Sequence, residues 1–474
     1  MSWSTCREHV LPAALTLTFA AAPAPLLSGQ QAVVRGDLGR RLDSALTASE
    51  RAGFSGAVLV ERGGSEVLYR GAGAAIEDPR TPFAPSTIVP IGSNTKDFTK
   101  AAILGLVEAG RLRLEDSLGR FFPDAPEDKH AITVRQLLDH TAGFPIGVGP
   151  DDERVTLTTW RQRLFATPLE FAPGTSRRYS NAGYSLLAAI IEQVSGVAYE
   201  RFLVQHVFAP AGMRETGLVL PRFDRQRLAH AYSAGLDRGT MLDKPRDSDG
   251  SYWNLRGNGG LVSTLEDMRR FYQAIVNDTA ILRSAAHRAM VVPPDGPTVL
   301  AGSDLVSFFM YARFPRESLE IFLASNHGRA PAPHLLDELL PIMGIQPPGR
   351  EGPHHAEGPT IPAGQAHPAF PETGPGRTVA EYFAAYNTGD TAAVRRFFTE
   401  HADSGPDAPS MAARLDRYRQ MFENLGRMTA ENVTTTPDGI EVRARAANGD
   451  LVTLTFIIKA AAPFRLGSLR VRVG

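Results

Sequence analysis

The sequence is almost devoid of cysteine and carries no excess of either charge. Its 474 residues contain one cysteine, Cys6, and 50 basic against 51 acidic side chains. A single cysteine excludes a disulfide within the chain. The balanced charge argues against a protein that binds nucleic acid or an anionic membrane surface, since such proteins carry a basic face or tail. At roughly 150 residues per domain, a globular protein of two or three domains is expected.

The amino-terminal 32 residues have the pattern of a cleavable secretion signal. Arg7 supplies a positive start, Leu11–Phe19 forms a short apolar core, and Ala22 and Ala24 offer a cleavage point between small residues. The core is too short and too interrupted by proline to span a bilayer, which takes about 20 apolar residues. We expect residues 1–32 to be removed, leaving a cysteine-free protein in a secreted or periplasmic location without a membrane span. The alternative is a disordered or tethering tail.

Strand patterns open and close the central part of the chain, and helical patterns fill its middle. Gly56–Val60 and Glu66–Arg70 predict one hairpin, and Val306–Phe314 with Leu319–Ser325 predict a second. Apolar residues at helical spacing lie between them. Helices are expected at Gly36–Arg51, from Ser93 to Gly110, from Thr133 to about His140, at Tyr184–Val194 and after Ser263 or Thr264. This segregation predicts the α+β class, with an antiparallel sheet flanked by helices.

A change in composition separates a smaller carboxy-terminal unit. Residues 346–376 contain repeated prolines and interspersed histidines, which favour a solvated linker over regular structure or a metal site. Residues 377–474 then predict three helices, the first two capped by Thr378 and Asp390 and the third closed by Gly426. Hairpin signals at 437–439 and 448–449 predict a strand meander after them.

The sharpest chemical signal is a Ser-x-x-Lys, Ser93 to Lys96, at the start of an apolar helix. At a spacing of three, both side chains lie on one helix face. A serine hydroxyl needs an adjacent base to act as a nucleophile, and a lysine serves as one when burial favours its neutral form. A serine and a lysine at this spacing also occur by chance. The alternative is that the pair only marks the start of a helix and that the lysine is solvated.

A second signal is Tyr179-Ser180-Asn181, on a loop before a helix. From this position Tyr179 could aim its phenol at the Ser93 hydroxyl, and Asn181 could present its amide to a substrate. With Ser93, Lys96 and Tyr179 as catalytic candidates and Asn181 as the substrate-binding candidate, the pattern is that of nucleophilic catalysis.

Four ordered blocks resemble the serine β-lactamase and penicillin-binding protein superfamily, on its class C or DD-peptidase-like branch. The similarity runs from about Ser44 to Gly344, and the domain is therefore expected at 33–345. The blocks are Gly92–Pro123, Ile132–Pro145, Phe171–Gly196 and Gly257–Phe271. The carboxy-terminal unit, with its stretch Tyr386–Asp390, is similar to NTF2-like modules of cone-like α+β fold, and we interpret it as an accessory domain for support or interaction.

The resemblance implies a role for each candidate. Ser93 would form the acyl-enzyme, and its backbone N–H would be half of the oxyanion hole. Lys96 would accept the proton or lower the pKa of the nucleophile. Tyr179 would act as general base in acylation and as proton donor to the leaving group. Asn181 would hydrogen-bond the substrate and Lys96.

The sequence departs from this family at a third motif, a Lys-Thr-Gly or His-x-Gly on a strand beside the nucleophile. The expected position, Thr298–Ser303, contains no basic residue, and the run from Pro293 to Gly302 looks too short, as if a strand segment were lost. His287 is interpreted as structural, and His327 as a weak candidate substitute. Without a cation, selectivity for a substrate carboxylate should weaken, which disfavours efficient β-lactam hydrolysis.

Other residues have structural interpretations that outweigh functional ones. His140, next to Asp139, fits a structural helix end better than a Ser-His-Asp triad, and Tyr252 with Trp253 fits loop packing at least as well as a cleft wall. No phosphate-binding loop stands out, and neither a cofactor nor a metal is expected.

Two hypotheses from different classes remain. The first is a secreted serine hydrolase that acts on an ester, a D-amino peptide (as a D-alanyl-D-alanine carboxypeptidase does) or a β-lactam, with small molecules, peptides or cell-wall peptidoglycan as partners. The second is a catalytically impaired, penicillin-binding-like binding or sensor protein. The intact Ser93, Lys96, Tyr179 and Asn181 favour the first, and the missing third motif favours the second.

Overall fold

The computed structural model describes residues 32–233, 236–303, 306–327, 331–346, 370–403, 410–436, 439–447, 451–459 and 464–473. Apart from Ala32, the expected signal at 1–32 lies outside the described residues, as does the linker between 347 and 369. Among the described residues, no helix has both the length and the apolar character needed to cross a membrane.

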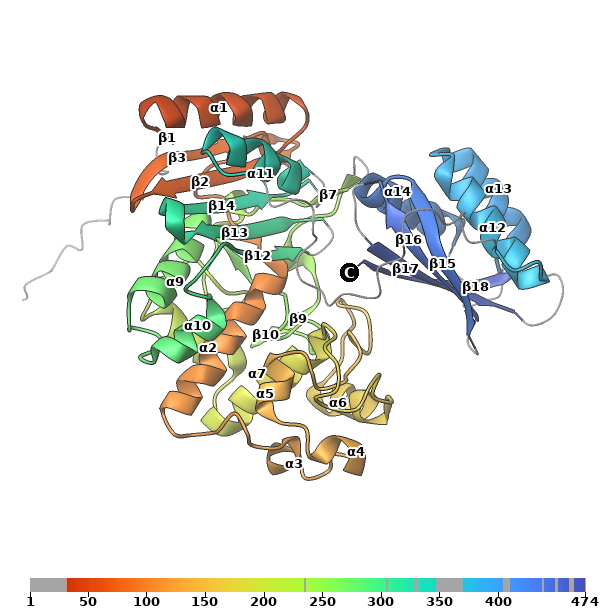
Figure 1. Ribbon diagram of the computed structural model, residues 1–474, viewed down its shortest axis with the longest axis horizontal. Coiled ribbons are helices and arrows are strands. Elements are labelled where there is room, and N and C mark those ends of the chain that lie inside the picture. The colour runs from red at the N-terminus through yellow and green to blue at the C-terminus, as the bar shows by residue number, and fades with distance from the viewer. Residues whose placement is uncertain are drawn as a thin grey trace, which may run out of the picture.

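A six-stranded antiparallel sheet joins the two ends of the larger unit (Figure 1). Its order is β1-β3-β2-β14-β13-β12, so that β2 and β14 pair from Gly56↔Ser325 to Arg62↔Leu319. The strands are β1 (Val33–Val34), β2 (Gly56–Arg62), β3 (Ser65–Ala72), β12 (Thr298–Ser303), β13 (Phe308–Phe314) and β14 (Leu319–Ser325). Both expected hairpins are therefore present, and the predicted α+β class with a helix-flanked antiparallel sheet is confirmed.

Alternating side chains of this sheet enter two different cores, as the two-residue period of a strand requires. On β2, Val58 and Val60 pack with helices α1 (Gly36–Arg51) and α11 (Pro331–Ile342) on one face. Ala57 and Leu59 pack with the helical region on the other face. Because both faces are covered, β2 reads as a nearly continuous apolar run.

The helical region lies on the opposite face of the sheet from α1 and α11 (Figure 1). Its central helix α2 is almost wholly buried, and the other helices of the region surround it. The helices are α2 (Thr95–Glu108), α3 (Leu118–Phe121), α4 (Glu127–His130), α5 (Val134–Leu138), α6 (Leu157–Ala166), α7 (Asn181–Ser195), α8 (Tyr199–Leu203), α9 (Leu265–Asn277) and α10 (Ala285–Val291). Thr133 caps α5 with a full capping box, as predicted, and of the two candidates Ser263 and Thr264 it is Thr264 that caps α9.

Four pairs of short antiparallel strands lie in the loops of the described part of this region. They are β4 (Ala74–Glu77) with β5 (Arg80–Pro82), β6 (Val89–Pro90) with β11 (Val262–Ser263), β7 (Tyr232–Ser233) with β8 (Leu236–Asp237), and β9 (Arg246–Asp247) with β10 (Gly250–Ser251). The β6–β11 pair matters most for the site, because the chain passes from β6 directly into the turn that carries Ser93.

In the described part of residues 370–473, the carboxy-terminal unit has three helices followed by a four-stranded antiparallel meander in the order β15-β16-β17-β18. The elements are α12 (Gly374–Asn387), α13 (Thr391–His401), α14 (Met411–Leu425), β15 (Met428–Thr436), β16 (Gly439–Ala446), β17 (Leu451–Ile458) and β18 (Leu466–Val473). An aromatic core with Tyr382, Phe397 and Phe456 joins helices to sheet.

The start of α12 corrects two expectations. The cap is Thr373, whose hydroxyl accepts from the Gly376 N–H at 3.2 Å, and not Thr378, which lies inside the helix. The helix thus begins within the stretch 346–376 that was expected to be irregular. Pro375 is compatible with it because a proline in the first turn lacks only an N–H that would have no partner within the helix.

Candidate functional site

Ser93 lies in a tight turn between β6 and α2. Residues Gly92–Asn94 form one 3-10 turn, and Gly92 takes a φ of +49°, which favours glycine. The turn leads into the first residue of α2, and the Ser93 side chain is half-buried at that helix start. This position brings the hydroxyl close to the backbone N–H groups of a helix amino terminus.

Lys96 lies on the same side of this turn and is bonded to Ser93. Its Nζ donates to Ser93 Oγ at 3.2 Å and to the Asn258 carbonyl at 2.6 Å, and the residue is only 5% exposed. Burial lowers the pKa of Lys96 to about 7, although Asp97 and Asp151 act in the opposite direction. Near neutral pH a large share of Lys96 is therefore neutral and able to accept a proton.

Tyr179 completes this cluster from a segment 86 residues away in the chain. Its phenol donates to Ser93 Oγ at 2.7 Å, and Lys96 Nζ lies 4.7 Å from the centre of its ring. A second ring, that of Tyr184 on α7, lies 5.7 Å from the same ammonium. The structure thus brings Ser93, Lys96 and Tyr179 together, and the two tyrosines form an aromatic wall beside the lysine.

Asn181 is the first residue of α7 and is held by its backbone. Its N–H donates to the Ile146 carbonyl at 2.8 Å, and its side-chain Oδ1 is buried without a hydrogen-bond partner among the described residues. The expected bond to Lys96 is not among those found, since Lys96 bonds Ser93 and Asn258 instead. A buried acceptor without a partner carries a desolvation cost that a donor on a ligand would relieve.

Strand β12 lies directly against the Ser93 turn. A Cβ added to Gly302 would lie 2.6 Å from the Ser93 backbone nitrogen, and one added to Gly92 would lie 2.5 Å from the Ser303 nitrogen. The strand pairs with β13 at six positions from Thr298 to Ser303 and forms the edge of the sheet. The expected position of the third motif is therefore a paired strand that carries no basic residue.

The two histidines considered for the missing motif have other partners. His327 Nε2 lies 3.1 Å from Glu77 Oε1, and its ring packs on Tyr232 at 5.1 Å. Its burial lowers its pKa, although Glu77 acts in the opposite direction. His287 lies in α10 and its Nδ1 is 2.9 Å from Glu108 Oε1, which agrees with a structural role.

A buried polar network supports the nucleophile turn from behind. The Tyr272 hydroxyl of α9 donates to Asp97 Oδ2 at 2.7 Å, and Asn94 Nδ2 donates to the same hydroxyl at 2.8 Å. Burial raises the pKa of Asp97. Asn94 Nδ2 also reaches the Leu300 carbonyl on β12 at 3.4 Å, so the network ties the turn, α9 and the sheet edge together.

Asn258 is a further site residue that sequence reasoning missed. Its side chain is fixed by donating to Ser185 Oγ at 2.8 Å and to the Asn254 carbonyl at 3.0 Å. This leaves its own carbonyl to receive the Lys96 ammonium. A backbone carbonyl can belong to any residue type, so the sequence of this position does not reveal its role. The only signal was the resemblance of the whole Gly257–Phe271 block to the family.

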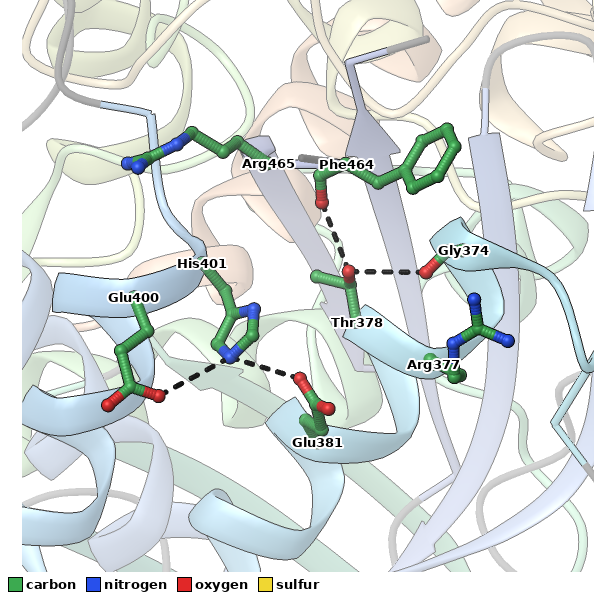
Figure 2. Close-up of a pocket in the computed structure, with 8 residues that line it drawn as sticks. All are labelled: Gly374, Arg377, Thr378, Glu381, Glu400, His401, Phe464 and Arg465. Carbon is green, nitrogen blue, oxygen red and sulfur yellow. Dashed lines mark hydrogen bonds and ion pairs between the residues drawn. The ribbon is translucent and has the colours of Figure 1, made fainter. Parts of the chain in front are cut away.

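The carboxy-terminal unit carries an open pocket of about 200 Å³ between α12, the end of α13 and the start of β18 (Figure 2). His401 lies 3.1 Å from Glu381 and 3.6 Å from Glu400, and the Thr378 hydroxyl donates to the Phe464 carbonyl at 3.0 Å. Two arginines that line it, Arg377 and Arg465, donate to the Glu372 and Ala402 carbonyls.

Comparisons with known proteins agree with this geometry. The family model described as Beta-lactamase matches residues 40–310. Penicillin-binding protein 4* of Bacillus subtilis (strain 168) is 29% identical over 263 residues, which are 51% of this chain and 57% of that protein. A putative penicillin-binding protein, PbpX, of the same organism is 30% identical over 246 residues, which are 52% and 61% of the two chains. The chain therefore spans about three fifths of the length of these relatives.

Solved structures share the fold at lower identity. A penicillin-binding protein from Bacillus halodurans gives a TM-score of 0.53 at 22% identity, covering 65% of this chain and 99% of its own. The D-amino acid amidase of Ochrobactrum anthropi SV3 gives 0.55 at 22% identity, covering 65% and 99%. Because the family model matches more than half of the sequence, and the fold agrees, the chain belongs to the Beta-lactamase family of serine hydrolases and penicillin-binding proteins.

Proposed function

We propose that this chain is a serine hydrolase that acts through an acyl-enzyme on Ser93. The observation that carries the proposal is one cluster of three atoms, in which Ser93 Oγ lies 2.7 Å from the Tyr179 hydroxyl and 3.2 Å from Lys96 Nζ. A nucleophile within hydrogen-bond reach of groups that can take its proton is the requirement for covalent catalysis.

In the proposed reaction Ser93 Oγ attacks a carbonyl carbon, and its proton passes to the pair formed by Lys96 and Tyr179. Tyr179 returns a proton to the leaving oxygen or nitrogen as that bond breaks. Water then attacks the carbonyl carbon of the acyl-enzyme, its proton passes to the Lys96–Tyr179 pair, and the pair returns a proton to Ser93 Oγ as the acyl group leaves. The N–H of Ser93 and the backbone of β12 at Gly302–Ser303 would stabilise the oxyanion. The buried Oδ1 of Asn181 would accept a hydrogen bond from the substrate.

The substrate class follows from what β12 offers. Gly302 takes the place of the glycine in the Lys-Thr-Gly motif, which puts Leu300 where the lysine would stand and Ala301 where the threonine would stand. No cation on this strand can then pair with a substrate carboxylate. We propose esters or amides with an uncharged acyl group as preferred substrates, including D-amino peptides, ahead of penicillins.

The Leu300→Lys variant tests this preference. A charge-assisted hydrogen bond to the carboxylate should raise kcat/KM for a penicillin, relative to that for a neutral nitrophenyl ester, by about 10- to 100-fold. Val299→Lys is the matched control, because Val299 is 47% exposed and points to the other face of β12. The proposed preference is contradicted if both lysine variants change the ratio of kcat/KM for penicillin to kcat/KM for the ester by the same factor.

Labelling of Ser93 tests the proposed function itself. The protein is incubated with a fluorophosphonate or, separately, with a penicillin, and adducts are located by peptide mass spectrometry. A fluorophosphonate adduct on Ser93 is expected in the wild type and in Thr95→Val, which removes a buried hydroxyl two residues along the chain, and is expected to vanish in Ser93→Ala. An unlabelled wild type that also fails to turn over a short-chain nitrophenyl ester would contradict the hydrolase.

The absence of a cation on β12 favours one alternative, a binding or sensor protein with impaired catalysis. Its signature is a stable penicillin adduct on Ser93 without turnover of either ester or lactam.

We also propose the division into a signal at 1–32, a hydrolase domain at 33–345, a linker that ends before α12, and an NTF2-like accessory domain that begins with α12 at Gly374. A secreted or periplasmic location, with cell-wall peptides as substrates, is supported by relatives whose names describe penicillin-binding proteins and putative D-alanyl-D-alanine carboxypeptidases.

A further inference from the structure

His140 occupies a constrained position directly after α5. It is a non-glycine residue with a φ of +60°, in the left-handed region that side-chain-bearing residues rarely adopt. It is only 9% exposed, and the chain beyond it is tied back by the Thr141 N–H, which donates to the Gln136 carbonyl at 2.9 Å. A residue keeps such a strained conformation only when several surrounding contacts hold it there. Strained residues of this kind are frequent at functional sites.

The contacts of His140 converge on Tyr179 from both sides. Its carbonyl accepts from the Arg178 N–H at 2.9 Å, and its Nδ1 accepts from the Ser180 N–H at 3.1 Å. Arg178 and Ser180 are the residues on either side of Tyr179. The imidazole also packs on the Tyr179 ring, with the ring centres 4.7 Å apart.

The same imidazole packs on the second tyrosine of the aromatic wall. The ring centres of His140 and Tyr184 are 5.0 Å apart, and the Tyr184 hydroxyl donates to the Leu138 carbonyl at 3.0 Å. His140 therefore lies behind both rings that face Lys96. Since Nδ1 accepts a hydrogen bond from a backbone N–H, the ring is assigned as the neutral tautomer with its proton on Nε2.

We propose that His140 is a positioning residue that clamps the backbone on both sides of Tyr179 and so holds its phenol on Ser93. The inference rests on the proposed function, because it concerns the proton transfer that Tyr179 performs there. His140 does not touch the reacting atoms in this account. Its Nδ1 holds the Ser180 N–H, its backbone carbonyl holds the Arg178 N–H, and its ring fixes the tilt of the Tyr179 ring.

Three substitutions separate the acceptor from the ring. His140→Ala removes both, and His140→Phe keeps a ring without the acceptor. His140→Asn keeps an acceptor near the position of Nδ1 and tolerates a positive φ. Each variant is first checked for folding by thermal melting and circular dichroism, and acylation of Ser93 is then measured as the rate of fluorophosphonate labelling and as kcat and KM for a nitrophenyl ester.

We expect His140→Ala to lower kcat and the labelling rate by about 100-fold, the lower end of the contribution of a general acid or base. KM should change little, because the substrate-binding groups stay in place. His140→Asn should recover most of the loss, and His140→Phe should recover less. This order is not expected from a merely structural histidine, for which the losses would follow the melting temperatures.

The proposal is overturned if folded His140→Ala labels at the wild-type rate, or if His140→Asn is no better than His140→Ala. Failure of the underlying function looks different, because the wild type itself would then show no adduct on Ser93.

Discussion

Lys96→Arg is expected to lower kcat/KM for a nitrophenyl ester by about a thousandfold, within the range that a general base contributes. The ammonium is buried at 5% exposure and its pKa is lowered to about 7, so that the wild type holds much neutral amine near neutral pH. Arginine keeps the positive charge and can still donate to the Asn258 carbonyl, but it does not deprotonate in proteins. The variant therefore separates a proton-accepting role from a purely electrostatic one.

The same residue sets the pH dependence. Lys96 is charged below its pKa and neutral above it, so kcat/KM of the wild type should rise with pH around a midpoint near 7 and level off above it. Lys100→Arg is the matched control, since Lys100 lies one turn further along α2 and its Nζ donates to the Met290 carbonyl at 3.1 Å. A Lys96→Arg variant with near wild-type activity, or a wild-type profile that is flat from pH 5 to 9, would contradict the assignment.

Gly302→Ala is expected to reduce kcat/KM by about 100-fold or more, on the scale of one lost oxyanion donor. The added Cβ would lie 2.2 Å from the Ile91 carbonyl oxygen and 2.6 Å from the Ser93 nitrogen. Because these are backbone atoms, they cannot rotate away, and β12 must separate from the nucleophile turn. Overpacking of this kind also costs about 1–3 kcal/mol of unfolding free energy.

Gly105→Ala is the control for this substitution. Gly105 lies in α2, and a Cβ added there would meet nothing within 4 Å. Replacement by alanine should therefore leave activity unchanged and raise the stability slightly, because alanine favours a helix over glycine. Kinetics and thermal melts of the two variants check the pair, and equal activity of Gly302→Ala and the wild type would refute the close approach of β12.

Much of the fold could be predicted from the sequence because its signals are local. The two hairpins and the caps of α5 and α9 follow from periodicity and from side chains that bond their own helix ends. The start of α12 differs from the prediction because Thr378, the predicted cap, lies inside the helix and Thr373 is its cap. Only the partner of each hydroxyl, the Gly376 N–H or the Phe464 carbonyl, distinguishes them.

The sequence predicts those residues of the site whose side chains belong to recognisable motifs. Ser93 and Lys96 share a helix face, but that Tyr179 meets them across 86 residues follows only from the resemblance or from the structure. The contacts that the sequence does not predict involve backbone groups. They are the Asn258 carbonyl, which accepts from Lys96, and the N–H groups of Arg178 and Ser180, which donate to His140. Such contacts depend on long-range geometry, and the residue type at the position does not reveal them.

The central claim, a covalent acyl-enzyme on Ser93, is tested most directly by trapping it with a substrate. The protein is mixed with excess nitrophenyl ester at pH 8, quenched in acid within the first turnover, and digested for peptide mass spectrometry. We predict the mass of one acyl group on the peptide that contains Ser93, and its absence in Ser93→Ala. Ester turnover with no acylated peptide, or with the acyl group on another residue, would contradict the claim.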